Sequence, residues 1–248
     1  MKNTEKFSGK AGIYSHYRPN YPEALIDDLI NAAGLTNRSS VADVGAGTGI
    51  FTRQLAARGL PVAAIEPNEG MRQEAMHLSA PFAAIEFIAA PAEAIPLPDG
   101  SVDLITAAQA FHWFDAVAFR KECRRLLKPR GVVALIWNSR DSEAPLTQDC
   151  ARICQTFCPE FNGFSGGHMA IDFRSFFQNG AFTEKQYAHP FTYTRDQFIG
   201  RYLSASYAPT HPQEVAAFRE TLAAVFETYA IGDVLPFPNE TRLYLGNV

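Results

Sequence analysis

Short apolar segments alternate with amphipathic segments between residues 39 and 138. Patterns of helical period occupy residues 49–58, 68–79 and 115–128. Nearly apolar runs precede, separate and follow them, at residues 40–44, 61–66, 84–89, 102–108 and 132–137. Such runs are typical of strands that are covered on both faces. The alternation predicts βαβ units around a parallel sheet.

Start and stop residues support these helices. Asn68 and Asp115 stand where helix N-caps are expected, and Gly59 follows the end of the first helix. A further helix is predicted at residues 22–33, with Gly34 just past its end.

Helical patterns dominate after residue 138. They cover residues 145–157, 169–178, 195–206 and 212–229, with an extended run at 182–193 and an alternating strand pattern at 241–248. Nine of the 19 phenylalanines fall between Phe157 and Phe198. This aromatic region either roofs a substrate pocket or forms the core of a helical cap, and both interpretations stay open.

Composition narrows the classes of function. The 248 residues carry 22 Lys and Arg against 26 Asp and Glu, a formal net charge of −4. Because nucleic-acid binders usually show a basic excess, we expect no nucleic-acid partner, whereas a small acidic ligand remains compatible. Residues 1–10 lack the apolar run of a signal peptide, and no run approaches the roughly 20 apolar residues that span a bilayer. We therefore expect a cytoplasmic protein with no membrane partner.

The strongest chemical signal is a predicted strand that runs into a glycine turn and opens a helix, Val41-Ala-Asp43-Val-Gly45-Ala-Gly47-Thr-Gly49. Glycines permit the tight turn and let a ligand touch bare backbone. Glu66 ends the next strand 21 residues after Gly45, where a carboxylate can accept both hydroxyls of a ribose. Asp43 would repel a pyrophosphate but would suit a cation such as a sulfonium. The simpler alternative is a tight βα turn without a ligand.

Five motifs occur in a fixed order over roughly residues 40–138. They are Asp43-Val-Gly45-Ala-Gly47-Thr-Gly49, Ile65-Glu66-Pro67-Asn68-Glu-Gly-Met71, Ala92-Glu93-Ala-Ile-Pro96-Leu-Pro-Asp99, Gln109-Ala-Phe-His112-Trp113-Phe114 and Leu127-Lys128-Pro129-Arg130-Gly131. Together they resemble the class I S-adenosylmethionine-dependent methyltransferases. The resemblance extends in particular to the branch with the trans-aconitate and the ubiquinone and menaquinone biosynthesis methyltransferases, and residues 7–19 are similar to the lead-in of these enzymes.

The resemblance implies a Rossmann-like, mostly parallel sheet of seven strands flanked by helices, with the last strand antiparallel and a helical cap inserted. A single methyltransferase domain would then span residues 1–248. Its parts would be an N-terminal lid and helix (1–38), a cofactor-binding core (39–138), a helical cap (139–181 and 194–230) and closing strands (182–193 and 241–248).

Nine positions match the family's cofactor-binding residues: Asp43, Gly45, Ala46, Gly47, Gly49, Glu66, Met71, Ala92 and Gln109. The resemblance implies that the glycine turn approaches the methionine and ribose parts of S-adenosylmethionine. Asp43 would help to hold the amino end and Glu66 would take the ribose hydroxyls. Met71 and the Ala92 amide would meet the adenine. Pro91 replaces an Asp or Ser that relatives often carry, so one adenine hydrogen bond would be missing.

Methyl transfer is an in-line displacement at a sulfonium methyl, so the protein mainly aligns a nucleophile and excludes water. Gln109 and His112 follow the fourth strand and are candidates for substrate contact. His112 is a candidate catalytic base, and the alternative is that it packs in an aromatic cluster. Tyr17 is a second candidate, in an N-terminal lid with Tyr14, His16 and Arg18, and the alternative there is a surface helix.

Three of the four cysteines, Cys150, Cys154 and Cys158, recur every four residues and form one stripe on a helix. Their spacing differs from that of radical S-adenosylmethionine enzymes. We expect buried apolar thiols and no metal.

These observations support methyl transfer from S-adenosylmethionine to a small-molecule acceptor, with S-adenosylhomocysteine as product and the acceptor atom open. Two alternatives remain: a non-catalytic regulator that binds S-adenosylmethionine, and a nicotinamide-dependent oxidoreductase on a related fold.

Overall fold

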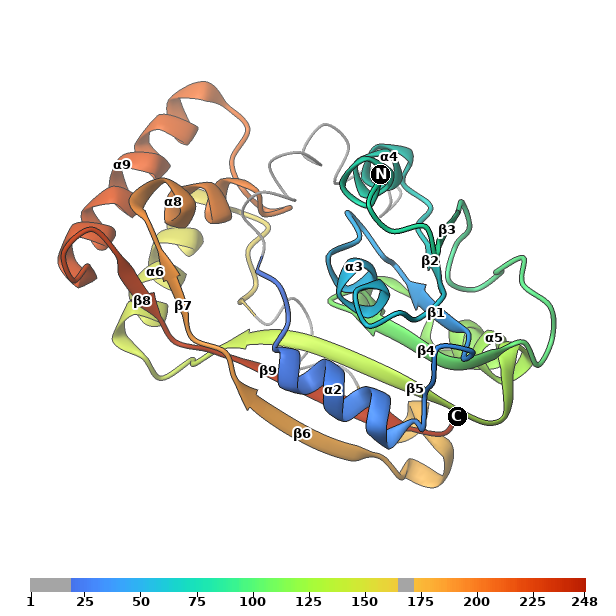
Figure 1. Cartoon of the computed structure of the whole chain (residues 1–248). Helices are drawn as coiled ribbons and strands as arrows, with labels where there is room; N and C mark the ends of the chain where they lie inside the picture. The colour runs from blue at the N-terminus through green and yellow to red at the C-terminus, as the bar shows by residue number, and fades with distance from the viewer. Residues whose placement is uncertain (1–18, 165–171) are drawn as a thin grey trace.

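The computed structural model describes residues 19–164 and 172–248 (Figure 1). Seven strands form its main sheet in the order β3-β2-β1-β4-β5-β9-β6. Their bounds are β1 Val41–Val44, β2 Val62–Ile65, β3 Ile85–Ile88, β4 Val102–Ala108, β5 Leu127–Arg140, β6 Thr183–Ala188 and β9 Asn239–Gly246. Strands β1 to β5 pair in parallel, whereas β9 lies antiparallel to both β5 and β6. The expected sheet, with its last strand reversed, is confirmed.

Helices follow the strands as the sequence predicts. Their bounds are α2 Glu23–Ala32, α3 Ile50–Ala56, α4 Glu69–Leu78, α5 Ala116–Leu126, α6 Pro145–Phe157, α7 Phe173–Phe176, α8 Arg195–Leu203 and α9 Pro212–Tyr229, with short 3-10 turns η2 Phe111–Trp113 and η4 Gln178–Gly180. The Asn68 side chain accepts from the Met71 amide and caps α4. The Asp115 side chain caps α5 by accepting from Val117 and Ala118. Both predicted N-caps are confirmed.

Each face of the sheet has its own apolar core. One cluster joins α2 and α3 to inward residues such as Val41, Leu104 and Ile136. The other joins α5 and α7 to the alternate residues, such as Ala42 and Ile105. Figure 1 shows α2 and α3 in front of the sheet and α5 behind it. Coverage of both faces explains why the sequences of the central strands β1, β2 and β4 are nearly apolar.

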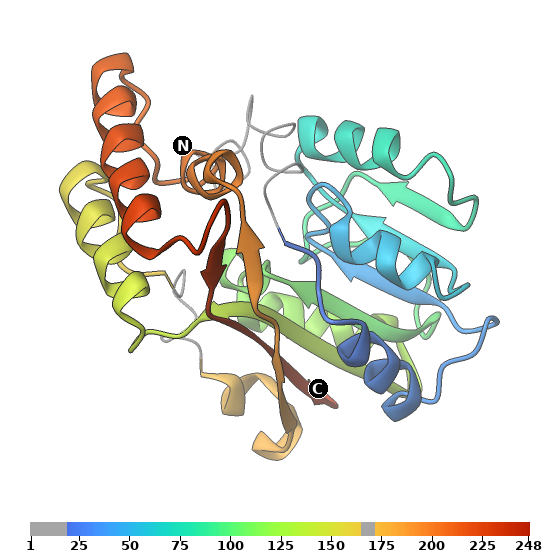
Figure 2. The same cartoon turned by 60° about the vertical axis from the view of Figure 1, so that its left-hand side comes forward.

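A third cluster lies beside the sheet. It unites α6, α8 and α9 with a two-stranded ribbon of β7 (Phe191–Tyr193) and β8 (Leu235–Phe237). Figure 2 shows these elements gathered at the end of the molecule that β5 and β9 reach, apart from α3 and α4. We call them the cap.

The phenylalanine-rich region is divided between two cores. Phe157, Phe161, Phe164, Phe191 and Phe198 belong to the cap cluster. The other four, Phe173, Phe176, Phe177 and Phe182, pack against the sheet cluster that contains α5. The interpretation as the core of a helical cap therefore holds for the first group only.

Several boundaries differ from the sequence expectations. Of the helix expected at 169–178, the described residues form only α7, Phe173–Phe176. Helix α8 ends at Leu203 rather than at residue 206, and β9 covers Asn239–Gly246 rather than 241–248. Strand β5 runs to Arg140 rather than ending at residue 137. The extended run at 182–193 is broken into β6 and β7, and β7 leaves the main sheet to pair with β8. The His189 amide still donates to the Asn239 carbonyl at 3.0 Å, but Pro190 follows and has no N–H to continue the ladder.

Candidate functional site

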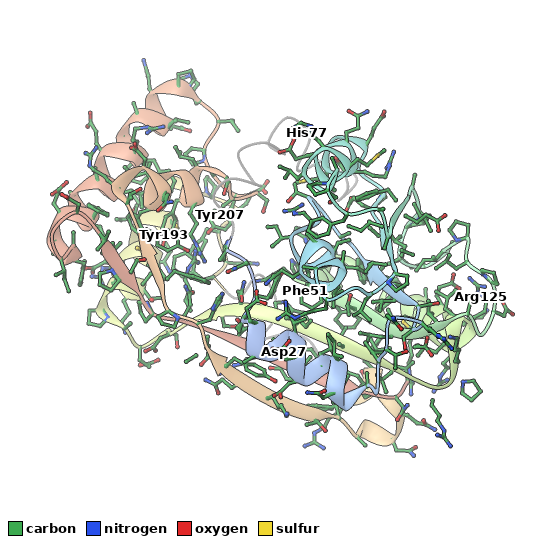
Figure 3. All side chains as sticks on the ribbon, viewed as in Figure 1. Asp27, Phe51, His77, Arg125, Tyr193 and Tyr207 are labelled. Atoms are coloured by element: carbon green, nitrogen blue, oxygen red, sulfur yellow. The ribbon has the colours of Figure 1, made fainter. Side chains whose placement is uncertain are left out.

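A pocket lies where β1, β2 and β4 end, at the edge where open α/β sheets bind ligands. Residues of the glycine turn, the β2 end and α4, the loop after β3, and the β4 end line it: Asp43, Gly45, Ala46, Gly47, Thr48, Glu66, Pro67, Asn68, Met71, Pro91, Ala92, Glu93, Ala108, Gln109, Ala110, Trp113 and Phe114. Tyr21, Ile50 and Phe51 complete the lining. Figure 3 shows Phe51 on α3, across from the cap residues Tyr193 and Tyr207. Eight of the nine expected cofactor-binding residues meet here, because only Gly49 is outside this lining.

The glycine turn uses positive φ angles that side chains resist. Gly45 has a φ of 70°, and a Cβ there would lie 2.5 Å from the Ala110 Cβ. Gly47 has a φ of 57°, but a Cβ there would meet nothing within 4 Å. Gly45 is thus required by packing, whereas Gly47 leaves open space beside the pocket.

Glu66 is tied to this turn. Its carboxylate accepts from the Gly47 amide at 2.9 Å and from the Asn68 amide at 2.8 Å, one bond at each oxygen. The side chain is 8% exposed, and burial raises its pKa above the ordinary 4.5 while the two amides oppose that change. Each carboxylate oxygen retains a further acceptor position.

Asp43 lines the pocket and is only 1% exposed. Its carboxylate accepts from the Thr52 hydroxyl at 2.5 Å and from the Thr106 hydroxyl at 2.8 Å. Burial raises its pKa above the ordinary 3.8, opposed by these two donors. Two buried acids therefore give this pocket the potential to hold a cation.

Thr48 was not singled out from the sequence. It is buried and lines the pocket, and its hydroxyl oxygen has no hydrogen-bond partner in the described part of the chain. A buried polar atom of this kind calls for a ligand or a water. In the sequence, its position between two glycines of the turn was the only indication that it could contact a ligand.

On the far side, Met71 is buried and Ala92 and Pro91 follow β3, all three lining the pocket. Gln109 directly follows β4 and has a φ of 56°, which is unusual for a residue with a side chain. Its amide donates to the Ile136 carbonyl and its Nε2 donates to the Asn138 carbonyl, each at 2.8 Å. This strained residue fixes the pocket wall to β5.

The candidate base His112 is not part of the pocket lining. Its ring packs against Trp113, with centroids 4.8 Å apart, and Trp113 is the residue that lines the pocket. The neighbouring Phe111 makes an edge contact with Phe114. The aromatic-packing interpretation therefore describes where His112 lies. Tyr17, with Tyr14, His16 and Arg18, lies outside the described residues.

The cysteine stripe is buried in the cap. Cys150, Cys154 and Cys158 are free thiols on or at the end of α6, and burial raises the pKa of each. Among residues 19–164 and 172–248, no three His, Cys, Asp or Glu side chains are arranged to hold a metal. The same residues contain no helix with the length and apolarity needed to cross a bilayer.

The reversed strand β9 beside β5, the glycine turn after β1 and the acid after β2 are the arrangement expected of the class I S-adenosylmethionine-dependent methyltransferases. Comparison with known proteins agrees with this arrangement, because residues 42–135 match the methyltransferase domain family.

Relatives and solved structures that are also described as methyltransferases cover different shares of the chain. An uncharacterized methyltransferase of Mycobacterium tuberculosis is 38% identical over 147 residues, 59% of this chain and 58% of its own length. One from Schizosaccharomyces pombe is 34% identical over 143 residues, 57% of this chain and 56% of its own. The chain thus spans less than two thirds of these relatives. A putative type II methyltransferase from Anaeromyxobacter dehalogenans has the same fold, with a TM-score of 0.68 at 24% identity over 93% of this chain and 98% of its own.

Proposed function

We propose that this protein transfers a methyl group from S-adenosylmethionine to a small-molecule acceptor. The observation that carries the proposal is Glu66, a buried carboxylate with one free acceptor position per oxygen, beside the open space at Gly47. That pairing suits a ribose, whose two hydroxyls donate to one carboxylate.

Three further features fit the cofactor. The Thr48 hydroxyl has no partner among the described residues and can form a hydrogen bond with a polar group of the cofactor. Met71 and Ala92 offer an apolar surface to the adenine. Asp43 and Glu66 give the pocket the negative charge that a cation needs. When bound, S-adenosylmethionine supplies the activated methyl group and the leaving sulfide.

The chain's own contribution is positioning. Gln109, held by two hydrogen bonds to β5, stands at the β4 end and sets the wall toward the cap. Trp113 and Phe114 shield the pocket from water. We infer that His112 acts by positioning Trp113, because the His112 ring packs against Trp113 and Trp113 lines the pocket.

Binding of S-adenosylhomocysteine by isothermal titration tests the proposal. Glu66→Ala should weaken binding at least 10-fold, since two hydrogen bonds to a charged group are lost. Glu69→Ala, an exposed acid one turn away on α4, is the matched control and should bind as wild type. An unchanged affinity in Glu66→Ala, or no binding to the wild-type protein, would contradict the proposal.

Two observations argue against the alternatives, a nicotinamide-dependent oxidoreductase and a non-catalytic regulator. A dinucleotide fold of the nicotinamide enzymes carries six parallel strands in its doubly wound sheet, whereas β9 here is reversed. The match to the methyltransferase domain family favours an enzyme over a non-catalytic regulator.

A further inference from the structure

Arg140 ends β5 at the boundary between the sheet and the cap. Its guanidinium carbon lies 3.8 Å from the ring centroid of Phe164, with Tyr202 at 5.3 Å and Phe237 at 5.7 Å. The side chain is mostly buried and its Nε is fully shielded. The Arg140 side chain makes no hydrogen bond or ion pair with any residue in 19–164 or 172–248, and its guanidinium contacts aromatic faces there.

The nearby acids do not serve Arg140. Glu240 follows Asn239 on β9 and therefore points to the opposite face of the sheet, where it accepts from Arg242 at 2.6 Å. Asp141, next in the chain, accepts from the Glu143 amide at 3.0 Å. The positive charge of Arg140 therefore has no carboxylate within the described chain.

A second polar group shares this position. Asn239 is the residue paired with Arg140 in the β5–β9 register, and directly opposed residues point to the same face with Cβ atoms about 5 Å apart. Asn239 is 8% exposed, and neither its amide oxygen nor its amide nitrogen has a hydrogen-bond partner among the described residues. Two adjacent side chains thus carry three buried polar atoms, Arg140 Nε and both amide atoms of Asn239, that have no partner among the described residues.

Such a pair is costly unless a ligand completes it. A buried unsatisfied polar group costs about 1–3 kcal/mol, and a buried charge costs more. Stacking on aromatic rings offsets about 0.5–2 kcal/mol but occupies the guanidinium face and leaves its N–H groups at the edge free. A carboxylate can accept two parallel bonds from those N–H groups, and the aromatic surroundings strengthen them by excluding water.

The pair lies within reach of the cofactor pocket. Gln109 lines the pocket and donates to the Asn138 carbonyl at 2.8 Å. Arg140 is two residues further along β5, about 7 Å, and its side chain is on the same face as that of Asn138. Figure 1 shows β5 continuing from the sheet toward α6 of the cap. A small acceptor can span this distance.

We propose that Arg140 and Asn239 bind a carboxylate group of the methyl acceptor and so select acidic small molecules. The proposal rests on the proposed methyl transfer for the identity of the ligand as acceptor. The net charge of −4 does not oppose it, because the pocket is defined by local groups rather than by the whole surface.

Matched pairs of ligands, each a carboxylate and its uncharged amide of nearly the same shape, test this subsite. Phenylacetate with phenylacetamide, and succinate with succinamide, are titrated calorimetrically into protein saturated with S-adenosylhomocysteine. The wild-type protein should bind at least one carboxylate 10-fold or more tightly than its amide. Arg140→Met should reduce that ratio to within 2-fold, and Arg140→Lys should keep part of it.

Two further variants separate binding from a structural role of Arg140. Arg130→Met removes an exposed arginine from the same strand and should keep the full carboxylate preference. Asn239→Asp places a carboxylate opposite Arg140, so it should raise the melting temperature and lower carboxylate affinity at least 10-fold. A purely structural arginine would give the first effect without the second.

The possible failures are distinct. If S-adenosylhomocysteine does not bind the wild-type protein, the proposed function fails, and the same carboxylate titrations without it still report on Arg140. If it binds but no carboxylate is preferred, or the preference survives in Arg140→Met, the subsite is overturned. Circular dichroism of each variant confirms that it is folded.

Discussion

Two buried carboxylates, Asp43 and Glu66, line one pocket, and their protonation controls what the pocket holds. Burial is the main cause that raises both pKa values, and the negative charge of Asp43 adds to the shift at Glu66. Keeping them ionised therefore costs the ligand-free protein free energy. A bound cation, with hydroxyls that donate to Glu66, would recover it.

Cofactor affinity should therefore depend on pH on the acid side of neutrality. As pH falls through the raised pKa of Glu66, above 4.5, the carboxylate is protonated and loses acceptor positions and charge. S-adenosylmethionine affinity should fall about 10-fold per pH unit there, and Glu66→Gln should flatten the profile. The ligand-free fold has the opposite sign: a raised acid pKa stabilises it at low pH, and that contribution is lost as pH rises through the raised value. Titration calorimetry and melting temperature across pH 4.5–7.5 measure both, and an affinity that does not change with pH would contradict this role of Glu66.

Gly45 and Gly47 should respond differently to the same substitution. Gly47→Ala adds a methyl group to open space beside the pocket, so it should cost only about 1 kcal/mol of unfolding free energy from its positive φ but weaken S-adenosylhomocysteine binding at least 10-fold. Gly45→Ala meets the Ala110 Cβ and should cost about 2–4 kcal/mol, comparable to overpacking a core. Denaturant unfolding and titration calorimetry separate the two effects.

Gly59 provides the matched control for Gly47. It has a φ of 78° and open space around its Cβ position, but it follows α3 and does not line the pocket. Gly59→Ala should lose similar stability and keep full affinity. Equal affinity in Gly47→Ala and Gly59→Ala would show that the ligand does not approach Gly47.

At the scale of elements, periodicity predicted most of the architecture because burial is nearly continuous along the central strands β1, β2 and β4 and one-sided along helices such as α2 and α5. Helices α6 and α9 begin and end at the predicted residues, and the caps at Asn68 and Asp115 are in place. Strand β8 was not expected, since three residues with Pro236 at the centre carry no period. The sequence predicted its partner β7 and the strand β6 as one extended run, because no pattern of apolar residues marks the change from one sheet to the other.

The sequence predicted those site residues that belong to one continuous motif. Glu66 and the glycine turn are adjacent to strand ends, so the sequence brings them to one edge. Arg140 and Asn239 lie 99 positions apart, and only the β5–β9 register makes them neighbours. For His112 the sequence left open a catalytic base and a member of an aromatic cluster, because periodicity does not set the direction of a residue in a 3-10 turn; the structure places its ring against Trp113.

For the molecule as a whole, charge is divided between the two sides of the site. The sheet side holds Asp43 and Glu66, which suit a cationic cofactor. The cap side holds Arg140, and Arg201 lies in the same aromatic cluster, over Tyr193 and Phe237. A cationic cofactor would be attracted to the acids on the sheet side, and an anionic acceptor to the arginines on the cap side. The opposite charges of the two ligands would also attract each other.

This division requires the cap and the sheet to fold as one unit, because Arg140 of β5 stacks on Phe164 and Tyr202 of the cap and the cap strand β8 leads directly into β9. We expect a single calorimetric unfolding transition. S-adenosylhomocysteine at 100 times its dissociation constant should stabilise the fold by about 2.7 kcal/mol and raise the melting temperature of the whole transition by roughly 5–10 °C. Two transitions, of which only one shifts with the ligand, would instead show that the cap is an independent module. The Arg140 side chain would then lie between two bodies rather than within one, and the carboxylate subsite would form only in part of the population.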